Sequence, residues 1–341
     1  MLTLDGSQGE GGGQILRTSL ALSLITGQAF CLKKIRAGRK KPGLLHQHLA
    51  GVKAAATVGN AQVIGAELGS REITFQPGEA QPGEYFFAVG TAGSAVLVLQ
   101  TVLPPLWMAA GPSRVTAEGG THNRMAPPFE FLERAFFPLV EQMGPRLTAS
   151  LHRHGFFPAG GGRVTVEVQP TADWRPLRLE RRGGLRSGEA TALVSRLPRH
   201  IAQRELQSVQ ETLDWPAHAF KIQEVTDSPG PGNAVILTVE SQHVVEVFTG
   251  FGERGVPAET VAGAAAAEAA EYLAADAPVG QHLADQLILP LALAGDGSFR
   301  TLTATPHTIT NIEVVERFLP VTFTVEPDSE QTCRISVAAR P

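Results

Sequence analysis

The chain has 341 residues, 43% hydrophobic and 18% charged, with a formal net charge of −4. This length is sufficient for a large core and about two domains. No apolar run approaches a membrane span and no basic region precedes an apolar one near the N-terminus, so we expect neither a span nor a signal peptide. Cys31 and Cys333 are isolated, which disfavours zinc and disulfides and favours a reduced, cytoplasmic setting. The acidic charge argues against a general nucleic-acid coat.

A glycine-rich segment lies near the start of the chain, between a predicted strand at residues 2–4 and a predicted helix. The segment is DGSQGEGGGQILR, residues 5–17. Free amides at a helix N-terminus favour an anion, and glycine lets the backbone approach a phosphate. Glu10 adds a carboxylate for a divalent metal, and Arg17 a guanidinium for a phosphate oxygen. The spacing matches neither a dinucleotide fingerprint nor a Walker loop, and a tight turn without a ligand is the alternative.

The predicted elements of the first half of the chain repeat in one order: strand, helix, strand, helix and two strands. The first copy consists of residues 2–4, 13–25, 30–36, 44–58, 61–64 and 72–75. The second copy consists of residues 85–89, 95–109, 113–117, 129–143, 146–151 and 163–168. Such an alternation predicts an α/β fold.

A third copy is predicted in two parts. A strand at 177–179 opens it, and its helix at 281–293 follows only after an intervening stretch. The remaining predicted elements of this copy are residues 299–304, 310–318, 321–325 and 333–338. The stretch between the parts is predicted to contain strands at 190–195, 220–225 and 234–240, a helix at 201–213 and an alanine-rich helix opening at Pro257.

This pattern predicts an α/β (α+β) protein with two domains. The large catalytic domain is expected to cover residues 1–185 and 276–341 and to consist of three βαβαββ-like repeats. A smaller α/β domain, residues 186–275, is expected as an insertion in the third repeat. One large irregular α/β domain is the alternative.

Basic residues gather in three segments. They are Arg36, Arg39, Lys40 and Lys41, followed by His46 and His48; then residues 152–154; then the arginines of residues 175–186. Such clusters are either solvated faces or local phosphate sites, and the pattern alone leaves both open.

His307 is the strongest single candidate for a nucleophile. It ends a predicted strand in TLTATPH, and Thr310 with Glu313 matches a capping box for the next helix. We therefore expect His307 just ahead of a helix N-terminus, where a phosphate would lie. A neutral imidazole can attack phosphorus while the helix end stabilises charge on the non-bridging oxygens. The alternative is a histidine that only forms hydrogen bonds near a helix end.

Four segments carry a resemblance to a known family. They are DGSQGEGGGQILR (5–17), IRAGRKKPGLLHQHL (35–49), HGFFPAGGGRV (154–164) and HTITNIEVVERFLP (307–320). In this order they resemble the RNA 3′-terminal phosphate cyclases from end to end, and the third is close to a diagnostic signature of that family. The resemblance implies three repeats with a smaller domain inserted in the third, in agreement with the repeat pattern.

The resemblance also implies a reaction, the ATP-dependent conversion of an RNA 3′-terminal phosphate to a 2′,3′-cyclic phosphodiester. His307 would attack the α-phosphorus of ATP, releasing pyrophosphate and forming a covalent histidyl–AMP. AMP would pass to the RNA 3′-phosphate, and the neighbouring ribose 2′-hydroxyl would then displace AMP. The substrate would be RNA with a 3′-phosphate end, because DNA lacks the 2′-hydroxyl. A divalent metal, Mg²⁺ or Mn²⁺, is implied by the charge that accumulates.

Further site residues follow from the same resemblance. Glu10 matches the metal-associated carboxylate, Gln100 a residue bonded to adenine, and Pro127 a position packed on the base. The nucleotide-binding stretch corresponds to His282, Leu283, Ala284, Asp285 and Gln286. The positions that handle phosphates of ATP and RNA are Arg17, Arg36, Arg39, Lys41, Gln47 and His48.

Two positions depart from the family pattern. His282 stands where a tyrosine is common, which puts the affinity for the nucleotide in question rather than the reaction. His122 stands where a smaller polar residue is frequent, which puts in question any role assigned to that loop position.

The sequence is compatible with three other functions. Cyclase-like proteins of ribosome assembly lack the nucleophilic histidine, so His307 in HTITN counts against them. An enolpyruvyl transferase has similar repeated units but uses no histidyl nucleotide. A non-catalytic RNA-binding module would use the basic clusters, but the chain has only 6% aromatic residues for stacking. The physiological RNA, the preferred metal and the oligomeric state, with a homodimer as one candidate, are not predicted.

Overall fold

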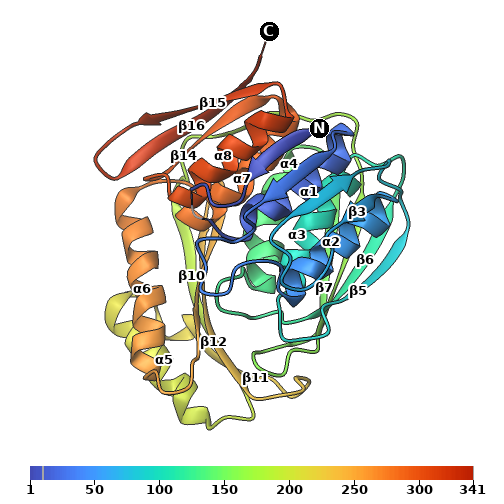
Figure 1. Ribbon diagram of the computed structural model, residues 1–341. Helices are drawn as coiled ribbons and strands as arrows, with labels where there is room; N and C mark the ends of the chain where they lie inside the picture. The colour runs from blue at the N-terminus through green and yellow to red at the C-terminus, as the bar shows by residue number, and fades with distance from the viewer. Residues whose placement is uncertain (10, 341) are drawn as a thin grey trace.

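A computed structural model describes residues 1–9 and 11–340, and these form a mixed α/β fold with four sheets of four strands each (Figure 1). The predicted α/β class is confirmed. Within this described part, no helix combines the length and the apolar character that crossing a membrane requires.

The first sheet is built from the N-terminal 76 residues. Its elements are β1 (Leu2–Asp5), α1 (Gln14–Thr26), β2 (Phe30–Lys33), α2 (His46–Val58), β3 (Gln62–Ile64) and β4 (Ile73–Gln76). The strand order is β1-β2-β4-β3, with β1 parallel to β2 and β4 antiparallel to both of its neighbours.

The second sheet has the same topology, β5-β6-β8-β7. Its elements are β5 (Glu84–Ala88), α3 (Ala95–Leu106), β6 (Ser113–Gly119), the π-helix η1 (Phe131–Phe136), α4 (Phe137–Gln142), β7 (Arg146–Arg153) and β8 (Gly162–Gln169). The sequence predicts one continuous helix over 129–143, whereas the structure has a π-helical turn followed by α4. Pro138 lies at the start of α4 and has no amide hydrogen, so one α-helical hydrogen bond is missing where the two helices join.

The third sheet combines two distant parts of the chain. Its elements are β9 (Leu177–Leu179), α7 (Gln281–Ala294), β14 (Asp296–Leu302), α8 (Pro306–Phe318), β15 (Val321–Pro327) and β16 (Thr332–Ala339). The strand order is β15-β16-β14-β9. Strand β9 is parallel to β14, as β1 is to β2, and β16 is antiparallel to both of its neighbours. The helices of the three sheets pack on one another, with α1 against α2, α3 and α8, and α7 against α8.

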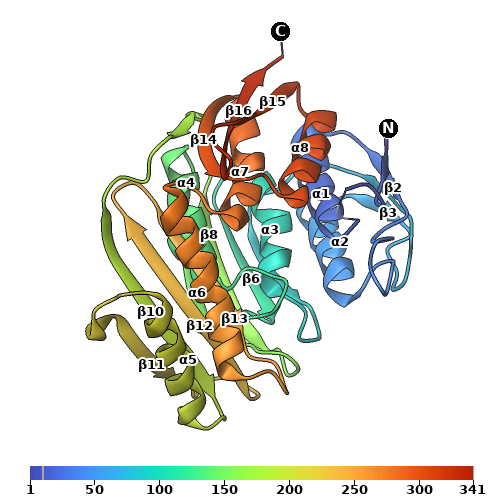
Figure 2. The ribbon, with the colours of Figure 1, turned by 90° about the vertical axis from the view of Figure 1, so that its left-hand side faces the viewer.

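The chain between β9 and α7 forms the fourth sheet, β11-β10-β12-β13. Its elements are β10 (Leu185–Ser195), α5 (Arg199–Thr212), the 3₁₀ turn η2 (Ala217–Ala219), β11 (Phe220–Glu224), β12 (Gly232–Ser241), β13 (Val245–Phe251) and α6 (Ala258–Ala275). The helices α5 and α6 cover one face of this sheet (Figure 2). Strand β13 is absent from the predicted elements.

Both faces of the fourth sheet are buried. On β12, Val235 and Leu237 belong to a core shared with α5 and α6, whereas Ala234 and Ile236 belong to the main core of the molecule. Strand β13 also packs against η1. The segment between β9 and α7 therefore shares a hydrophobic interface with the rest of the protein.

Helix α8 begins earlier than predicted. Its first residue is Pro306 and its N-cap is Thr305, whose side chain accepts a hydrogen bond from Thr308 N at 3.2 Å. The predicted Thr310–Glu313 capping box is wrong, because Thr310 lies inside the helix and its Oγ1 donates to the Pro306 carbonyl at 2.7 Å. Proline is favoured at the first helical position, where no amide hydrogen is needed. His307 accordingly lies within the first turn of α8 rather than ahead of it.

Candidate active site

The glycine-rich loop lies against two segments that are distant in the sequence. Gly9 and Gly11 have φ angles of +52° and +59°, which favour glycine. A Cβ atom at Gly9 would lie 1.9 Å from Thr310 Oγ1 on α8. The Gly11 carbonyl accepts a hydrogen bond from Gly38 N in the basic segment at 3.3 Å. The loop therefore brings α8 and the basic segment together at the N-terminus of α1.

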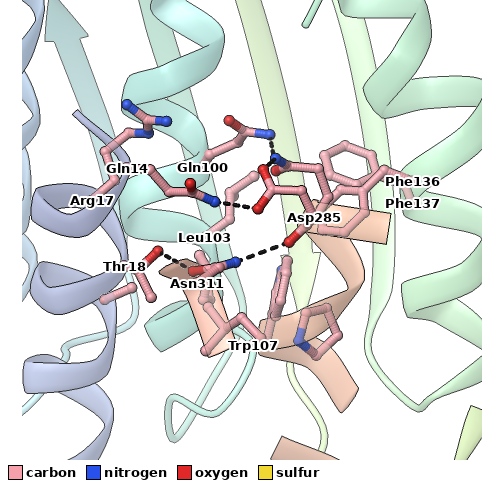
Figure 3. A pocket seen from close by; sticks show the side chains of 15 residues that line it. Gln14, Arg17, Thr18, Gln100, Leu103, Trp107, Phe136, Phe137, Asp285 and Asn311 are labelled. Carbon is pink, nitrogen blue, oxygen red and sulfur yellow. Dashed lines mark hydrogen bonds between the residues drawn. The ribbon is translucent and has the colours of Figure 1, made fainter. Parts of the chain in front are cut away.

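His307 faces the first residue of α1. Its Nδ1 lies 3.1 Å from Gln14 Oε1, and Gln14 Nε2 donates a hydrogen bond to the Asp285 carboxylate on α7 (Figure 3 shows the Gln14–Asp285 bond). The second bond fixes the amide of Gln14 with its oxygen toward the imidazole. Because an amide oxygen only accepts, His307 Nδ1 carries the proton, and Nε2 keeps its lone pair.

Asp285 connects three helices (Figure 3). Its side chain also accepts a hydrogen bond from Gln286 Nε2 at 2.9 Å, and its carbonyl accepts one from Asn311 Nδ2 on α8 at 2.9 Å. Asn311 Oδ1 in turn accepts from Thr18 Oγ1 on α1 at 2.8 Å. Such a connected network fixes the position of Gln14, and through it the ring of His307.

The electrostatic surroundings favour a neutral imidazole. His307 is open to solvent on one side, and burial of the rest, together with the charges of Arg39 and Arg17, lowers the pKa of its imidazole below the ordinary value despite the opposing charge of Asp285. Burial in turn raises the pKa of the Asp285 carboxyl, against the hydrogen bond from Gln14. His307 is therefore uncharged near neutral pH and able to act as a nucleophile.

A cavity of about 50 Å³ lies beside this network. Gln14, Arg17, Gln100, Asp285, Gln286 and Asn311 contribute polar groups to its lining, and Leu103, Trp107, Phe136, Phe137 and Leu289 contribute apolar ones. Burial lowers the pKa of Arg17 to about 10, so the guanidinium is still cationic at neutral pH. No hydrogen bond or ion pair joins it to another residue of 1–9 and 11–340, so this cation is available to an anion such as a phosphate.

The residues predicted to bind the nucleotide are only partly brought together. Gln100 and Gln286 line the cavity and are hydrogen-bonded to each other at 2.6 Å. Leu283 and Ala284 are buried in the core and do not line the cavity. Pro127 is half-buried in the loop between β6 and η1, outside the cavity lining.

The basic segment has one side chain near His307 and one that supports the loop itself. Arg39 is close enough to His307 to lower the pKa of its imidazole. Arg36 donates from one guanidinium nitrogen to the carbonyls of Lys41 and Gly43, at 2.7 and 2.9 Å. Arg36 therefore fixes the shape of the segment, while the side chain of Lys41 is exposed.

His48 and Gln47 lie at the start of α2, and the His48 ring approaches Gly13 at the end of the glycine loop. His48 Nδ1 accepts a hydrogen bond from Leu45 N at 3.2 Å. Burial and the charges of Arg36 and Arg17 lower the pKa of His48 to about 3, so it is a neutral donor through Nε2. Gln47 Oε1 accepts from the N-cap of α3, Ser94 N, at 3.1 Å.

The predicted metal residue, Glu10, lies outside the described residues. Among residues 1–9 and 11–340, no three His, Cys, Asp or Glu side chains gather as a metal-binding group. Cys31 and Cys333 are both free and buried.

Several residues of the network were not predicted. Gln14 and Asn311 lie inside the motifs, and Thr18 directly follows the first one. Helical spacing was a signal for them, because Gln14 and Thr18 are four residues apart, as are His307 and Asn311.

His122, the second departure from the family pattern, supports a loop. It is buried and its Nε2 lies 2.9 Å from Glu130 Oε2, which closes the loop that carries Pro127.

This chain is similar to known proteins over nearly all of its length. A family model described as RNA 3′-terminal phosphate cyclase matches residues 8–325. A protein of Koribacter versatilis with that name is 52% identical over 340 residues, covering 100% of this chain and 96% of its own. Relatives of the same name from Ralstonia nicotianae and Salmonella agona are 52% and 51% identical, covering 96% and 97% of this chain and 94% and 95% of their own.

The chain belongs to the RNA 3′-terminal phosphate cyclase family. The match includes His307 and all the hydrogen-bonding partners described around it, on α1, α7 and α8. The network of this cyclase therefore lies wholly within the shared part of the chain.

Proposed function

We propose that this protein converts an RNA 3′-terminal phosphate to a 2′,3′-cyclic phosphodiester with consumption of ATP, through histidyl–AMP and an RNA-adenylate. Family membership supports the overall reaction. The mechanism rests on one observation, the hydrogen-bonded chain from Asp285 through Gln14 to His307 Nδ1. That chain leaves the other ring nitrogen, Nε2, as the nucleophile.

In the first step, His307 Nε2 attacks the α-phosphorus of ATP and the bond to pyrophosphate breaks. The imidazole becomes cationic as the bond forms, and the nearby carboxylate of Asp285 stabilises that charge through Gln14. Arg17 faces the cavity as a cation, and we assign it to a phosphate of ATP. Gln100, Gln286 and Asp285 are assigned to the nucleoside, with Pro127 and His282 on the base.

In the second step, an oxygen of the RNA 3′-phosphate attacks the same phosphorus and His307 leaves as a neutral imidazole. In the third, the ribose 2′-hydroxyl attacks the activated 3′-phosphorus, the cyclic diester forms, and AMP departs. The 2′-oxygen is on the neighbouring carbon, so orientation supplies most of the acceleration. Arg39, Lys41 and His48 are assigned to the RNA end. Arg39 is close enough to His307 to lower the pKa of its imidazole, and the His48 ring approaches Gly13 of the glycine loop.

A divalent cation, Mg²⁺ or Mn²⁺, would supply charge neutralisation at the phosphates. We retain Glu10 as the carboxylate that would hold it. The described residues fit this assignment in one respect: Gly9, just before Glu10, lies against Thr310 on α8, one turn of helix from His307.

We also propose that the first three sheets are three copies of one βαβαββ unit, with residues 186–275 inserted in the third. Their identical strand order supports this division. The large domain would then comprise residues 1–185 and 276–341. Two free buried cysteines are in keeping with a reduced, cytoplasmic setting, and RNA with a 3′-phosphate end is the partner.

The experiment that tests the mechanism is covalent labelling with α-³²P ATP and Mg²⁺. Wild type should retain label that is acid-labile and base-stable, as expected of a phosphoramidate. His307→Ala should retain none, while a matched control at an exposed histidine of α5, His200→Ala, should label as wild type. Unchanged labelling of the His307 variant would contradict the mechanism.

A further inference from the structure

Two glutamates from the inserted segment meet the first turn of α7. Glu246 on β13 is buried, and its Oε1 accepts a hydrogen bond from the N-cap amide, Gly280 N, at 2.5 Å. Glu268 on α6 lies with its Oε1 3.1 Å from His282 Nε2. The helix that carries the nucleotide-binding stretch is thus held at its start by residues outside the large domain.

His282 is the one member of this group that faces open space. Its side chain is 73% exposed, whereas that of Glu268 is 32% exposed. An exposed ring fixed at one nitrogen by a partly buried carboxylate has a set position but an open face, as a stacking residue requires.

The ionisable groups that influence His282 or respond to it lie on four elements. Glu268 lies on α6, Glu246 on β13 and Asp285 on α7 itself, and His307 on α8 is close enough for the charge of His282 to lower its pKa. Burial raises the pKa of the Glu246 carboxyl to about 8, so this group is largely protonated near neutral pH. The hydrogen bond that His282 Nε2 donates to Glu268 is the largest influence. Together with the smaller effects of Glu246 and Asp285, it raises the pKa of the His282 imidazole against partial desolvation of the ring. His282 therefore keeps its positive charge to higher pH than an isolated histidine.

The next step rests on the proposed function, which assigns ATP to this end of α7. We propose that Glu268 is a positioning residue for the nucleotide: its contact with His282 Nε2 holds that ring in place to stack on the adenine. A cation against an aromatic face is more strongly attracted than a neutral ring. The inserted segment thereby contributes to ATP binding, although it carries none of the catalytic motifs.

The proposal makes nucleotide affinity depend on pH through His282. The charged ring is present below its raised pKa and is lost as the pH rises through that value, so binding weakens on the alkaline side. Removing the carboxylate of Glu268 moves this transition to lower pH. A tyrosine at position 282 removes the part of the transition that His282 causes, because a phenol stacks without a charge in this range.

The test is the affinity of wild type, Glu268→Gln, His282→Tyr and the double variant for α,β-methylene-ATP, which binds but cannot transfer AMP, between pH 5.5 and pH 9. We expect Glu268→Gln to bind the analogue roughly two- to fivefold more weakly than wild type near neutral pH. Its affinity should also begin to fall at a lower pH than that of wild type. Glu271→Gln, an exposed glutamate on the same helix, is the matched control and should resemble wild type.

The double variant decides between positioning and general stability. If Glu268 acts through His282, adding Glu268→Gln to His282→Tyr changes nothing further. An equal loss of affinity in both backgrounds, or no effect of Glu268→Gln at any pH, overturns the proposal. Adenylation with ATP is measured separately, so wild type that binds the analogue but forms no AMP adduct counts against the proposed mechanism and not against this inference.

Discussion

Gln100 and Gln286 occupy the same place in two different helices and are hydrogen-bonded to each other, with Gln100 Nε2 2.6 Å from Gln286 Oε1. Each is the sixth residue of its helix, α3 or α7, and each is followed four residues later by a proline inside that helix, Pro104 or Pro290. Proline has no amide hydrogen, so neither glutamine carbonyl receives the usual α-helical hydrogen bond. Both residues and both prolines line the cavity. The contact therefore joins equivalent positions of two structurally similar units at the proposed ATP site.

Replacing Gln100 should affect ATP more than RNA. Gln100→Leu leaves Gln286 Oε1 without its donor and removes an amide from the cavity, so we expect the KM for ATP in adenylation to rise about tenfold, the order of one lost hydrogen bond. The rate at saturating ATP and the affinity for RNA should change little. Gln210→Leu, on the surface of α5, serves as the control. An equal loss in RNA affinity would show that Gln100 does not belong to the nucleotide site.

The sequence predicted most elements because their signals are local. The apolar residues of α1 recur at helical spacing, and Pro257 marks the start of α6, where the structure has it as the N-cap. Strand β13 escaped prediction because it is buried on both faces and has Glu246 as its second residue, so neither alternation nor a continuous apolar run identifies it. The start of α8 was misplaced because two threonines, Thr305 and Thr310, are each followed by a plausible helical segment, and only tertiary packing distinguishes them.

The candidate site was predictable as a set of residues but not as a geometry. His307 and the glycine loop carry motifs that can be read directly from the chain. The bond from Gln14 to Asp285 joins residues 271 positions apart, and the contact with His307 spans 293. Periodicity describes one helix at a time, so it contains no information on which face of α1 meets α7 and α8.

Gln14 should control the reactivity of His307. In Gln14→Leu, Nδ1–H loses its acceptor, both tautomers become accessible, and the lone pair is no longer confined to Nε2. We expect the adenylation rate to fall about tenfold, the order expected from one hydrogen bond, with little change in the KM for ATP. Gln142→Leu, at an exposed position of α4, is the matched control. An unchanged single-turnover rate would mean that something other than Gln14 orients the imidazole.

Arg39 should separate the first step from the later ones. Its charge helps to lower the pKa of His307, so Arg39→Ala should raise that pKa and shift the acid limb of the adenylation profile to higher pH. At pH 8, above the acid limb of both wild type and the variant, the adenylation rate should be nearly normal, while the rate of cyclisation of a 3′-phosphate RNA falls. The salt dependence of RNA binding should become shallower by about one counterion. If adenylation at pH 8 falls as far as cyclisation, Arg39 serves ATP and the RNA end must be bound elsewhere.

Glu205 should make the stability of the fourth sheet depend on pH. It is fully buried on α5, and one carboxyl oxygen accepts from Asn233 Nδ2 at 2.7 Å while the other has no partner among residues 1–9 and 11–340. Burial raises the pKa of this carboxyl to about 7, against the hydrogen bond from Asn233. The folded protein therefore keeps a proton that the unfolded chain releases near pH 4.5.

Because the folded-state pKa of Glu205 is the higher one, its proton stabilises the fold fully below pH 4.5, and that contribution is lost as the pH rises toward 7. The loss amounts to about 3 kcal/mol in the free energy of unfolding. Glu205→Gln keeps an acceptor for Asn233 but cannot ionise, so the variant should gain stability over wild type between pH 5 and pH 8 in urea unfolding. Glu211→Gln, exposed on the same helix, should show no such pH-dependent gain. If the free energies of unfolding of Glu205→Gln and wild type differ by the same amount at pH 5 and at pH 8, Glu205 is ionised in the folded protein.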